Sequence, residues 1–167
     1  MKCLFVRHPF AGWICDRVKV IEYRTRATKV RGRIGIVQSR TGMVIGDVEI
    51  TDCTYNEELD YYEWHLEHGR RYRKPVPFRG KSGAVVWIDV DFNPDKQESA
   101  PRLTSEELKA AVSAYEVELD KFLHPAAAWI VVMKDGRRIR FEDEKERDAF
   151  EADHAAEIDS FIAEAKE

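Results

Sequence analysis

The residues best suited to chemistry lie between positions 17 and 40, where cationic side chains dominate. This stretch holds eight Lys/Arg and a single acid, Glu22. A run of one sign repels itself, so it is stable only where it is solvated, paired or facing an anion. The pattern therefore predicts either a site for phosphate groups or a solvated basic surface, and spacing alone leaves both open. The cations are Arg17, Lys19, Arg24, Arg26, Lys29, Arg31, Arg33 and Arg40.

Apolar residues threaded through this stretch indicate an ordered frame rather than a disordered basic tail. Val20, Ile34 and Ile36 are among them, and such residues need a core to pack against. Residues 19–24 alternate in polarity, which predicts an extended segment. The pattern K-x-x-E-x-R does not place all three charges on one face of a regular strand, so a backbone irregularity is expected there.

The composition predicts a folded protein with a real core. The chain has 167 residues, 44% of them hydrophobic and 11% aromatic. This fits one domain, or one small domain with an appendage, and excludes global disorder. No apolar run approaches the roughly 18–20 residues that span a bilayer, and the N-terminus lacks the apolar region of a signal peptide. A cytoplasmic protein without a membrane partner is therefore expected.

Charge is distributed unevenly along the chain. Residues 1–92 contain 16 Lys/Arg and 12 Asp/Glu, a net charge of +4, whereas residues 93–167 contain 11 and 19, a net charge of −8. The first part is suited to attract a polyanion and the second to repel one. The overall charge of −4 conceals this division.

The cysteines and histidines predict no metal site. Cys3, Cys15 and Cys53 are odd in number and include no C-x-x-C pair, which suits a reducing compartment. His65 and His68 are three residues apart in a predicted helix, but a third ligand is missing from the pattern. Neither a metal nor an organic cofactor is therefore expected.

The predicted elements give an α+β fold. Residues 93–103 are polar, contain two prolines and are predicted to be a linker. After them, Thr104 and Glu107 form a capping box that predicts a helix start, and Asp135-Gly136 predicts a hairpin turn. Strands are expected at 2–7, 34–39, 44–51, 84–92, 129–134 and 137–141. Helices are expected at 9–18, 56–69 and 104–125 and after Asp143, and a basic loop is expected at 70–74.

Four segments in the first half of the chain carry distinctive motifs in a fixed order: CLFVRHPFAGWI, VKVIEYRTRATKVRGRIGIVQS, VIGDVEITDC and KPVPFRGKSGAVVWIDVDF. Together they resemble the ASCH domain, a family related to the PUA superfamily of small β-barrels that bind RNA or DNA. The resemblance covers about residues 2–92.

The resemblance implies a fold and a site. It implies a five- or six-stranded, mostly closed barrel with a helix near its mouth and a charged cleft. By motif match the cleft residues are Lys19, Glu22 and Arg24, with Arg33 close by and Lys81 from the segment before the last strand. With the linker and the elements predicted from the residues after it, the expected organisation is an ASCH domain at 1–92, a linker at 93–103 and an acidic helix–hairpin–helix extension at 104–167.

The first functional hypothesis is binding of RNA or single-stranded nucleic acid, with DNA as a further possibility. Basic residues would neutralise phosphates, and tyrosines or Trp64 would stack on unpaired bases. Packing in the core or at its rim is the alternative role of these aromatic residues. The residues assigned to this interface are Lys19, Glu22, Tyr23, Arg24, Arg26, Lys29, Arg31, Arg33, Arg71, Tyr72 and Lys81, helped by Arg70, Arg73 and Lys74.

The second hypothesis is a small hydrolase acting on a modified nucleoside or RNA. Some members of the family resemble amidohydrolases of acylated cytidine, and others are linked to RNA cleavage. Hydrolysis there would use a lysine to activate a hydroxyl nucleophile, and Lys19 matches that lysine. Glu22 stands where the family pattern has threonine, so it is either an ion-pair partner of Lys19 or a general base. Lys19 and Glu22 are the catalytic candidates.

The third hypothesis is a protein-interaction adaptor. The acidic residues 104–167 would dock a basic protein partner or cover the positive cleft in the manner of a nucleic acid. The alternative role of this segment is to complete the packing of the domain.

Overall fold

The computed structural model describes residues 1–79, 86–123, 126–142 and 144–165. The chain forms two compact units, Met1–Tyr115 and Glu116–Glu167. The division lies inside one helix, α2, Ser105–Leu123. Lys81, one of the residues assigned to the cleft from the sequence, lies outside the described residues.

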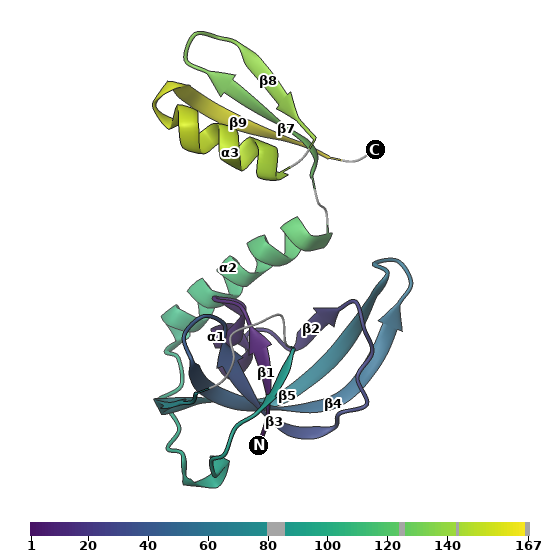
Figure 1. Ribbon diagram of the computed structural model, residues 1–167, viewed down its shortest axis with the longest axis vertical. Coiled ribbons are helices and arrows are strands. Elements are labelled where there is room, and N and C mark those ends of the chain that lie inside the picture. The colour runs from purple at the N-terminus through teal and green to yellow at the C-terminus, as the bar shows by residue number, and fades with distance from the viewer. Residues whose placement is uncertain (80–85, 124–125, 143, 166–167) are drawn as a thin grey trace. The chain divides into compact units, whose positions relative to one another are not determined.

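The first unit is built on a six-stranded mixed sheet (Figure 1). Its strands run in the order β2-β5-β4-β3-β1-β6. β1 pairs in parallel with β3, and every other neighbouring pair is antiparallel. The strands are β1 (Lys2–Val6), β2 (Ile21–Arg24), β3 (Gly32–Gln38), β4 (Met43–Asn56), β5 (Tyr61–Pro77) and β6 (Trp87–Asp89). An α+β fold with a mixed sheet is thus present.

The expected closure of this sheet into a barrel is wrong for the described residues. The edge strands β2 and β6 have four and three residues, and no ladder joins them in the described part of the chain. Side chains meet across the gap instead. Trp64 of β5 stacks on Trp87 of β6 with ring centroids 5.6 Å apart, and Arg24 of β2 donates to the carbonyl oxygen of Phe5 in β1 at 2.9 Å. Strands this short offer few backbone groups for a ladder.

The helix expected at 56–69 and the basic loop expected at 70–74 are both wrong, because this region is the hairpin of β4 and β5. Leu59, Tyr62 and Leu66 are spaced as on one face of a helix, yet Trp64 and Leu66 are buried at alternate positions of a strand. Aromatic residues favour strands, and pairing with β4 decides between the two periods. The Asn56 side chain accepts from the backbone N–H groups of Glu58 and Leu59, both at 3.1 Å, and this closes the turn.

Helix α1 (Phe10–Cys15) packs against β3, β4 and β5. Ala11 and Ile14 are buried among strand residues such as Ile36 and Ile50. A Cβ on Gly69 would collide with the carbonyl oxygen of Ile14, so glycine is what allows this close contact between helix and strand. The helix ends before the expected Val18, because Arg17 adopts the left-handed conformation with φ 63°.

The segment predicted as a linker lies along β5. A single 3₁₀ turn, η1 (Pro94–Lys96), comes first. The Arg73 N–H then donates to Glu98 at 2.9 Å, and the Ala100 N–H donates to Arg71 at 2.8 Å. α2 begins after Thr104, where the predicted capping box is confirmed: the Glu107 carboxylate accepts from the Thr104 N–H at 2.8 Å, and the Glu107 N–H donates to the Thr104 hydroxyl at 3.3 Å.

The second unit contains a three-stranded antiparallel sheet in the order β8-β7-β9, with α3 packed on β7 and β8 (Figure 1). The predicted hairpin is confirmed, and Gly136 in its turn has φ 87°. The expected long final helix is wrong beyond His154, because β9 pairs with β7. Phe161 and Ile162 favour a strand once a partner strand is present. Asp143, the residue expected to cap the final helix, lies outside the described residues. The elements are β7 (Ala126–Met133), β8 (Arg138–Phe141), α3 (Glu144–His154), η2 (Ala155–Glu157) and β9 (Ile158–Ala165).

No helix in the described part of the chain has both the length and the apolar character needed to cross a membrane.

Candidate nucleic-acid interface

Lys19, Glu22 and Arg24 form a largely buried charge cluster, the Lys19 cluster, on the edge strand β2 and the segment just before it. The Glu22 carboxylate accepts from both cations: Lys19 Nζ lies 3.3 Å from one oxygen and Arg24 Nη2 lies 2.9 Å from the other. Lys19 is 5% exposed and Glu22 is 7% exposed. The structure therefore brings together the three residues that the sequence grouped.

The backbone irregularity expected in this segment lies just before the strand. Glu22 and Arg24 are two positions apart in β2 and share one face, but Lys19 precedes the strand. The N–H groups of Val18 and Lys19 both donate to the carbonyl oxygen of Trp13, at 2.8 and 3.0 Å, which bends the chain. Lys19 Nζ also donates to the carbonyl oxygen of Ile21. The bend turns the lysine back towards Glu22.

Three aromatic rings surround the ammonium group of Lys19. The ring centroids of Phe10, Tyr23 and Tyr115 lie 5.9, 5.2 and 5.8 Å from Nζ, within the range of cation–π attraction. Burial lowers the pKa of Lys19, and the charge of Glu22 opposes this effect. Burial raises the pKa of Tyr115 to about 12, with added effects from Tyr23 and Glu22, so its phenol remains protonated at neutral pH.

Arg24 connects the Lys19 cluster to a pair of stacked tryptophans. Its guanidinium carbon lies 5.7 Å from the centroid of Trp64, which stacks on Trp87. The Trp64 indole donates to the carbonyl oxygen of Arg26 at 3.1 Å. Trp64 is 2% exposed and belongs to the core. Arg24 Nε is buried and has no hydrogen-bond acceptor among the described residues.

A second cluster, the Asp47 cluster, ties down several arginines that the sequence offered for phosphate binding. Asp47 is 3% exposed. Its carboxylate accepts from Arg33 at 3.0 Å, from Arg70 at 2.6 Å and from the Tyr72 hydroxyl at 2.7 Å. Arg33 also pairs with Asp95 at 2.5 Å. Arg33 and Arg70 are therefore paired with acids of this chain, and the Tyr72 hydroxyl is hydrogen-bonded to Asp47.

The remaining predicted residues divide between paired and exposed positions. Arg71 forms a two-pronged pair with Asp16, with its Nε 2.7 Å from the carboxylate. Tyr72 is buried and packs against Phe92, so it presents no free ring face. Arg26 and Lys29 are exposed and form no ion pair with a described residue.

The two histidines considered for a metal make other contacts on β5. His65 Nε2 is 2.8 Å from the Thr54 hydroxyl, and His68 Nδ1 is 3.0 Å from Glu49. Within residues 1–79, 86–123, 126–142 and 144–165, no group of three or more His, Cys, Asp or Glu side chains is placed to hold a metal ion.

Sequence reasoning missed Asp47, Phe10 and Tyr115. Asp47 carried one signal, since it is an acid inside a strand otherwise rich in apolar residues. Phe10 and Tyr115 carried none, because their spacing fits ordinary packing faces, and Tyr115 is also far from Lys19 along the chain.

Comparison with known families decides the identity of the fold. The profile of the ASCH domain matches residues 4–125. The chain belongs to the ASCH domain family. This is a PUA-like family associated with RNA binding. The match reaches beyond the segments that carried the resemblance and includes α2, so Tyr115 lies within the ASCH region.

Solved structures of an ASCH protein from Zymomonas mobilis are similar to this chain. That protein is 18% identical with a TM-score of 0.40, and the match covers 67% of this chain and 93% of that chain. A single-residue variant of it gives the same identity and TM-score, with 67% and 96% covered. A comparison with curated proteins found no match.

Proposed function

We propose that this ASCH protein binds RNA or another single-stranded nucleic acid through the Lys19 cluster and the adjoining loop of residues 25–31. The observation that carries the proposal is the Lys19 cluster itself. It gathers two cations and a carboxylate among aromatic rings, next to a loop that presents exposed cations.

The loop is suited to hold phosphates because it is ordered before a ligand arrives. The Trp64 indole holds the Arg26 carbonyl, and Arg31 donates to the Thr28 carbonyl at 3.0 Å. Arg26 and Lys29 point charge outwards without a described acid partner. The partner of Arg31 is Asp52, whose side chain is 61% exposed. Such an exposed pair is weak and can exchange for a phosphate.

The Lys19 cluster is suited to contact a base. Each Glu22 oxygen pairs with one cation. A carboxylate oxygen has two lone pairs, so each can accept a further hydrogen bond from a base. Arg24 is the more accessible cation, with a side chain 24% exposed. Tyr23 is half-buried beside Lys19 and supplies an aromatic face of the kind on which bases stack.

The test is fluorescence anisotropy with labelled single-stranded RNA, single-stranded DNA and duplex DNA across a range of salt concentrations. Saturable binding that weakens linearly in log–log form with salt is expected, and the slope estimates the number of phosphate contacts. The variant Arg26→Glu/Lys29→Glu should weaken binding by roughly tenfold or more, because it places repulsion where phosphates are expected.

The matched control is Lys109→Glu/Arg138→Glu. It changes the net charge by the same amount at exposed positions on α2 and β8, and its affinity should stay near that of the unaltered protein. Equal losses in the two double variants would show only a general charge effect. Absence of saturable binding to all three probes would refute the proposal.

A second candidate, hydrolysis of a modified nucleoside, is supported by one observation. Burial lowers the pKa of Lys19, which brings this amine closer to the range of a general base. Glu22 is the carboxylate beside it. Incubation with a panel of acylated nucleosides tests this candidate. Turnover that disappears in Lys19→Met would support it, and no conversion of any substrate would exclude it.

A further inference from the structure

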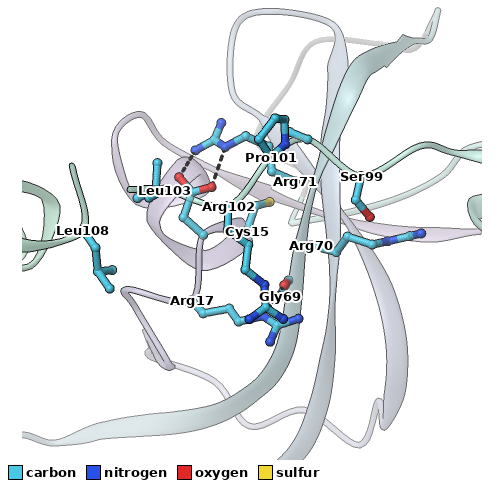
Figure 2. Close-up of a pocket in the computed structure, with 12 residues that line it drawn as sticks. Cys15, Arg17, Gly69, Arg70, Arg71, Ser99, Pro101, Arg102, Leu103 and Leu108 are labelled. Atoms are coloured by element: carbon cyan, nitrogen blue, oxygen red, sulfur yellow. Dashed lines mark hydrogen bonds and ion pairs between the residues drawn. The ribbon is translucent and has the colours of Figure 1, made fainter. Parts of the chain in front are cut away.

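A cavity of about 330 Å³ lies beside α1, bounded by the end of that helix, by β5 and by residues 99–108 (Figure 2). None of Lys19, Glu22 and Arg24 lines it, so it is separate from the Lys19 cluster. Its wall is fixed, because residues 98–100 are hydrogen-bonded along β5. This volume falls in the range of cavities that bind small organic ligands.

Arginines dominate the charged lining of this cavity. Arg17, Arg70, Arg71 and Arg102 contribute to the wall, against one acid, Asp16. The Asp16 carboxylate accepts two hydrogen bonds from Arg71, and Arg70 is held by Asp47. The charges of Asp16 and Arg71 cancel, and those of Arg70 and Arg33 are balanced by Asp47 and Asp95.

Two positive charges at the cavity are left over. Arg17 and Arg102 are exposed, and neither forms an ion pair within the described parts of the chain. Arg17 is held in place by one bond, from its Nε to the carbonyl oxygen of Gly69 at 2.7 Å. Its terminal nitrogens therefore remain available, and guanidinium groups bind the oxygens of phosphate in a forked geometry.

Cys15 and the two leucines that line the cavity carry no negative charge that would repel an anion. Burial raises the pKa of the Cys15 thiol to about 12, so the sulfur carries no charge at neutral pH. Leu103 and Leu108 add apolar side chains to the lining. A ligand with an anionic end and a less polar body would match a cavity lined by both arginines and leucines.

We propose that this cavity binds a terminal phosphate monoester of mononucleotide size, with the phosphate on Arg17 and Arg102 and the body against Leu103 and Leu108. The same chemistry is presented by a free nucleoside monophosphate and by the 5′-phosphorylated end of an RNA strand. The site does not depend on the proposed interface at the Lys19 cluster.

The first experiment is isothermal titration calorimetry of the full chain with adenosine monophosphate, adenosine and inorganic phosphate. Adenosine monophosphate should bind, and adenosine should bind at least about tenfold more weakly, because a charge-assisted contact is lost. Inorganic phosphate should compete with the nucleotide. Equal binding of nucleotide and nucleoside would contradict the assignment of the phosphate to the arginines.

Variants locate the site. Arg102→Gln removes an exposed charge and should weaken nucleotide binding roughly tenfold; Arg17→Gln should do the same. Arg138→Gln, on β8 in the second unit, is the matched control and should leave the affinity unchanged. Thermal unfolding of each variant shows whether the fold is retained. Unaltered nucleotide binding in folded Arg17→Gln and Arg102→Gln variants would overturn the proposal.

Two oligoribonucleotides of the same sequence distinguish the sources of the phosphate. A 5′-phosphorylated strand that binds more tightly than its 5′-hydroxyl counterpart, with the difference lost in Arg102→Gln, identifies an RNA end as the ligand. Binding of the free nucleotide without that difference identifies a mononucleotide. Failure of both the nucleotide and the 5′-phosphate to bind would refute the site, whereas loss of general strand binding alone would refute only the Lys19 interface.

Discussion

Replacement of Asp47 by alanine is expected to lower the free energy of unfolding by about 3 kcal/mol, at the low end of what breaking a buried ion pair costs. The substitution leaves Arg70 and the buried Tyr72 hydroxyl without their carboxylate acceptor. Because the side chains of Arg33 and Arg70 are 38% and 24% exposed, water offsets part of the loss. Urea unfolding measures the change, and Asp52→Ala, which removes an exposed pair with Arg31, is the control expected to show no clear loss.

The same carboxylate predicts a dependence of stability on pH. Burial by itself raises the pKa of Asp47, but hydrogen bonds from Arg70, Tyr72 and Arg33 outweigh it and the pKa is lowered. Its stabilisation is therefore complete above the unfolded-state pKa of about 3.9 and is lost as the pH falls through the lower folded-state value. The gap in stability between the unaltered protein and Asp47→Asn should narrow as the pH drops below about 4. If the difference in unfolding free energy between the two proteins stays constant as the pH falls well below about 4, the ionised Asp47 carboxylate is not the source of the stabilisation.

Local sequence signals were sufficient where neighbouring residues determine the structure. The helix start at Thr104 depends on a side chain three residues away, and the hairpin at Gly136 depends on a two-residue turn. Residues 34–39 were predicted as a strand, and β3 covers nearly the same range. In the first two cases the deciding interactions lie within a few positions along the chain. In the third, the β-branched residues Ile34, Ile36 and Val37 favour a strand before any partner is known.

Sequence signals failed where a distant strand supplies the partner. The spacing of Leu59, Tyr62 and Leu66 fits a helix, but β4 pairs with this segment and fixes it as a strand. Residues after His154 also fit an amphipathic helix until β7 pairs with them. An apolar run that satisfies both periods cannot be assigned without knowing its neighbour.

The candidate site shows the same division. Lys19, Glu22 and Arg24 are close in sequence, and their grouping was predictable. The acids that neutralise other arginines were not: Asp47 is 23 residues from Arg70, and Asp16 is 55 residues from Arg71. A count of basic residues therefore overstated how many are available to a phosphate, and the cavity beside α1 left no pattern in the sequence.

Glu22→Gln is expected to have the second large effect on stability, because it removes the carboxylate that Lys19 and Arg24 share. Burial already lowers the pKa of Lys19, Arg24 lowers it further, and the charge and hydrogen bond of Glu22 are what raise it. Without that charge the pKa of Lys19 should fall further, and the free energy of unfolding should drop by about 3 kcal/mol. The lysine pKa is measured by NMR titration of its side chain, and the stability by urea unfolding.

The sign of the pH effect separates this explanation from a simple loss of packing. A lysine whose folded-state pKa lies below its unfolded value of about 10.4 destabilises the fold at low pH, and this penalty disappears as the pH rises between the two values. Glu22→Gln should therefore regain stability with rising pH over a wider range than the unaltered protein. Adding Lys19→Met to Glu22→Gln should restore part of the stability, because the buried unpaired charge is gone. If the double variant is as unstable as Glu22→Gln and neither shows the pH-dependent recovery, the cost arises from Arg24 or from packing, and Lys19 is not the group that Glu22 serves.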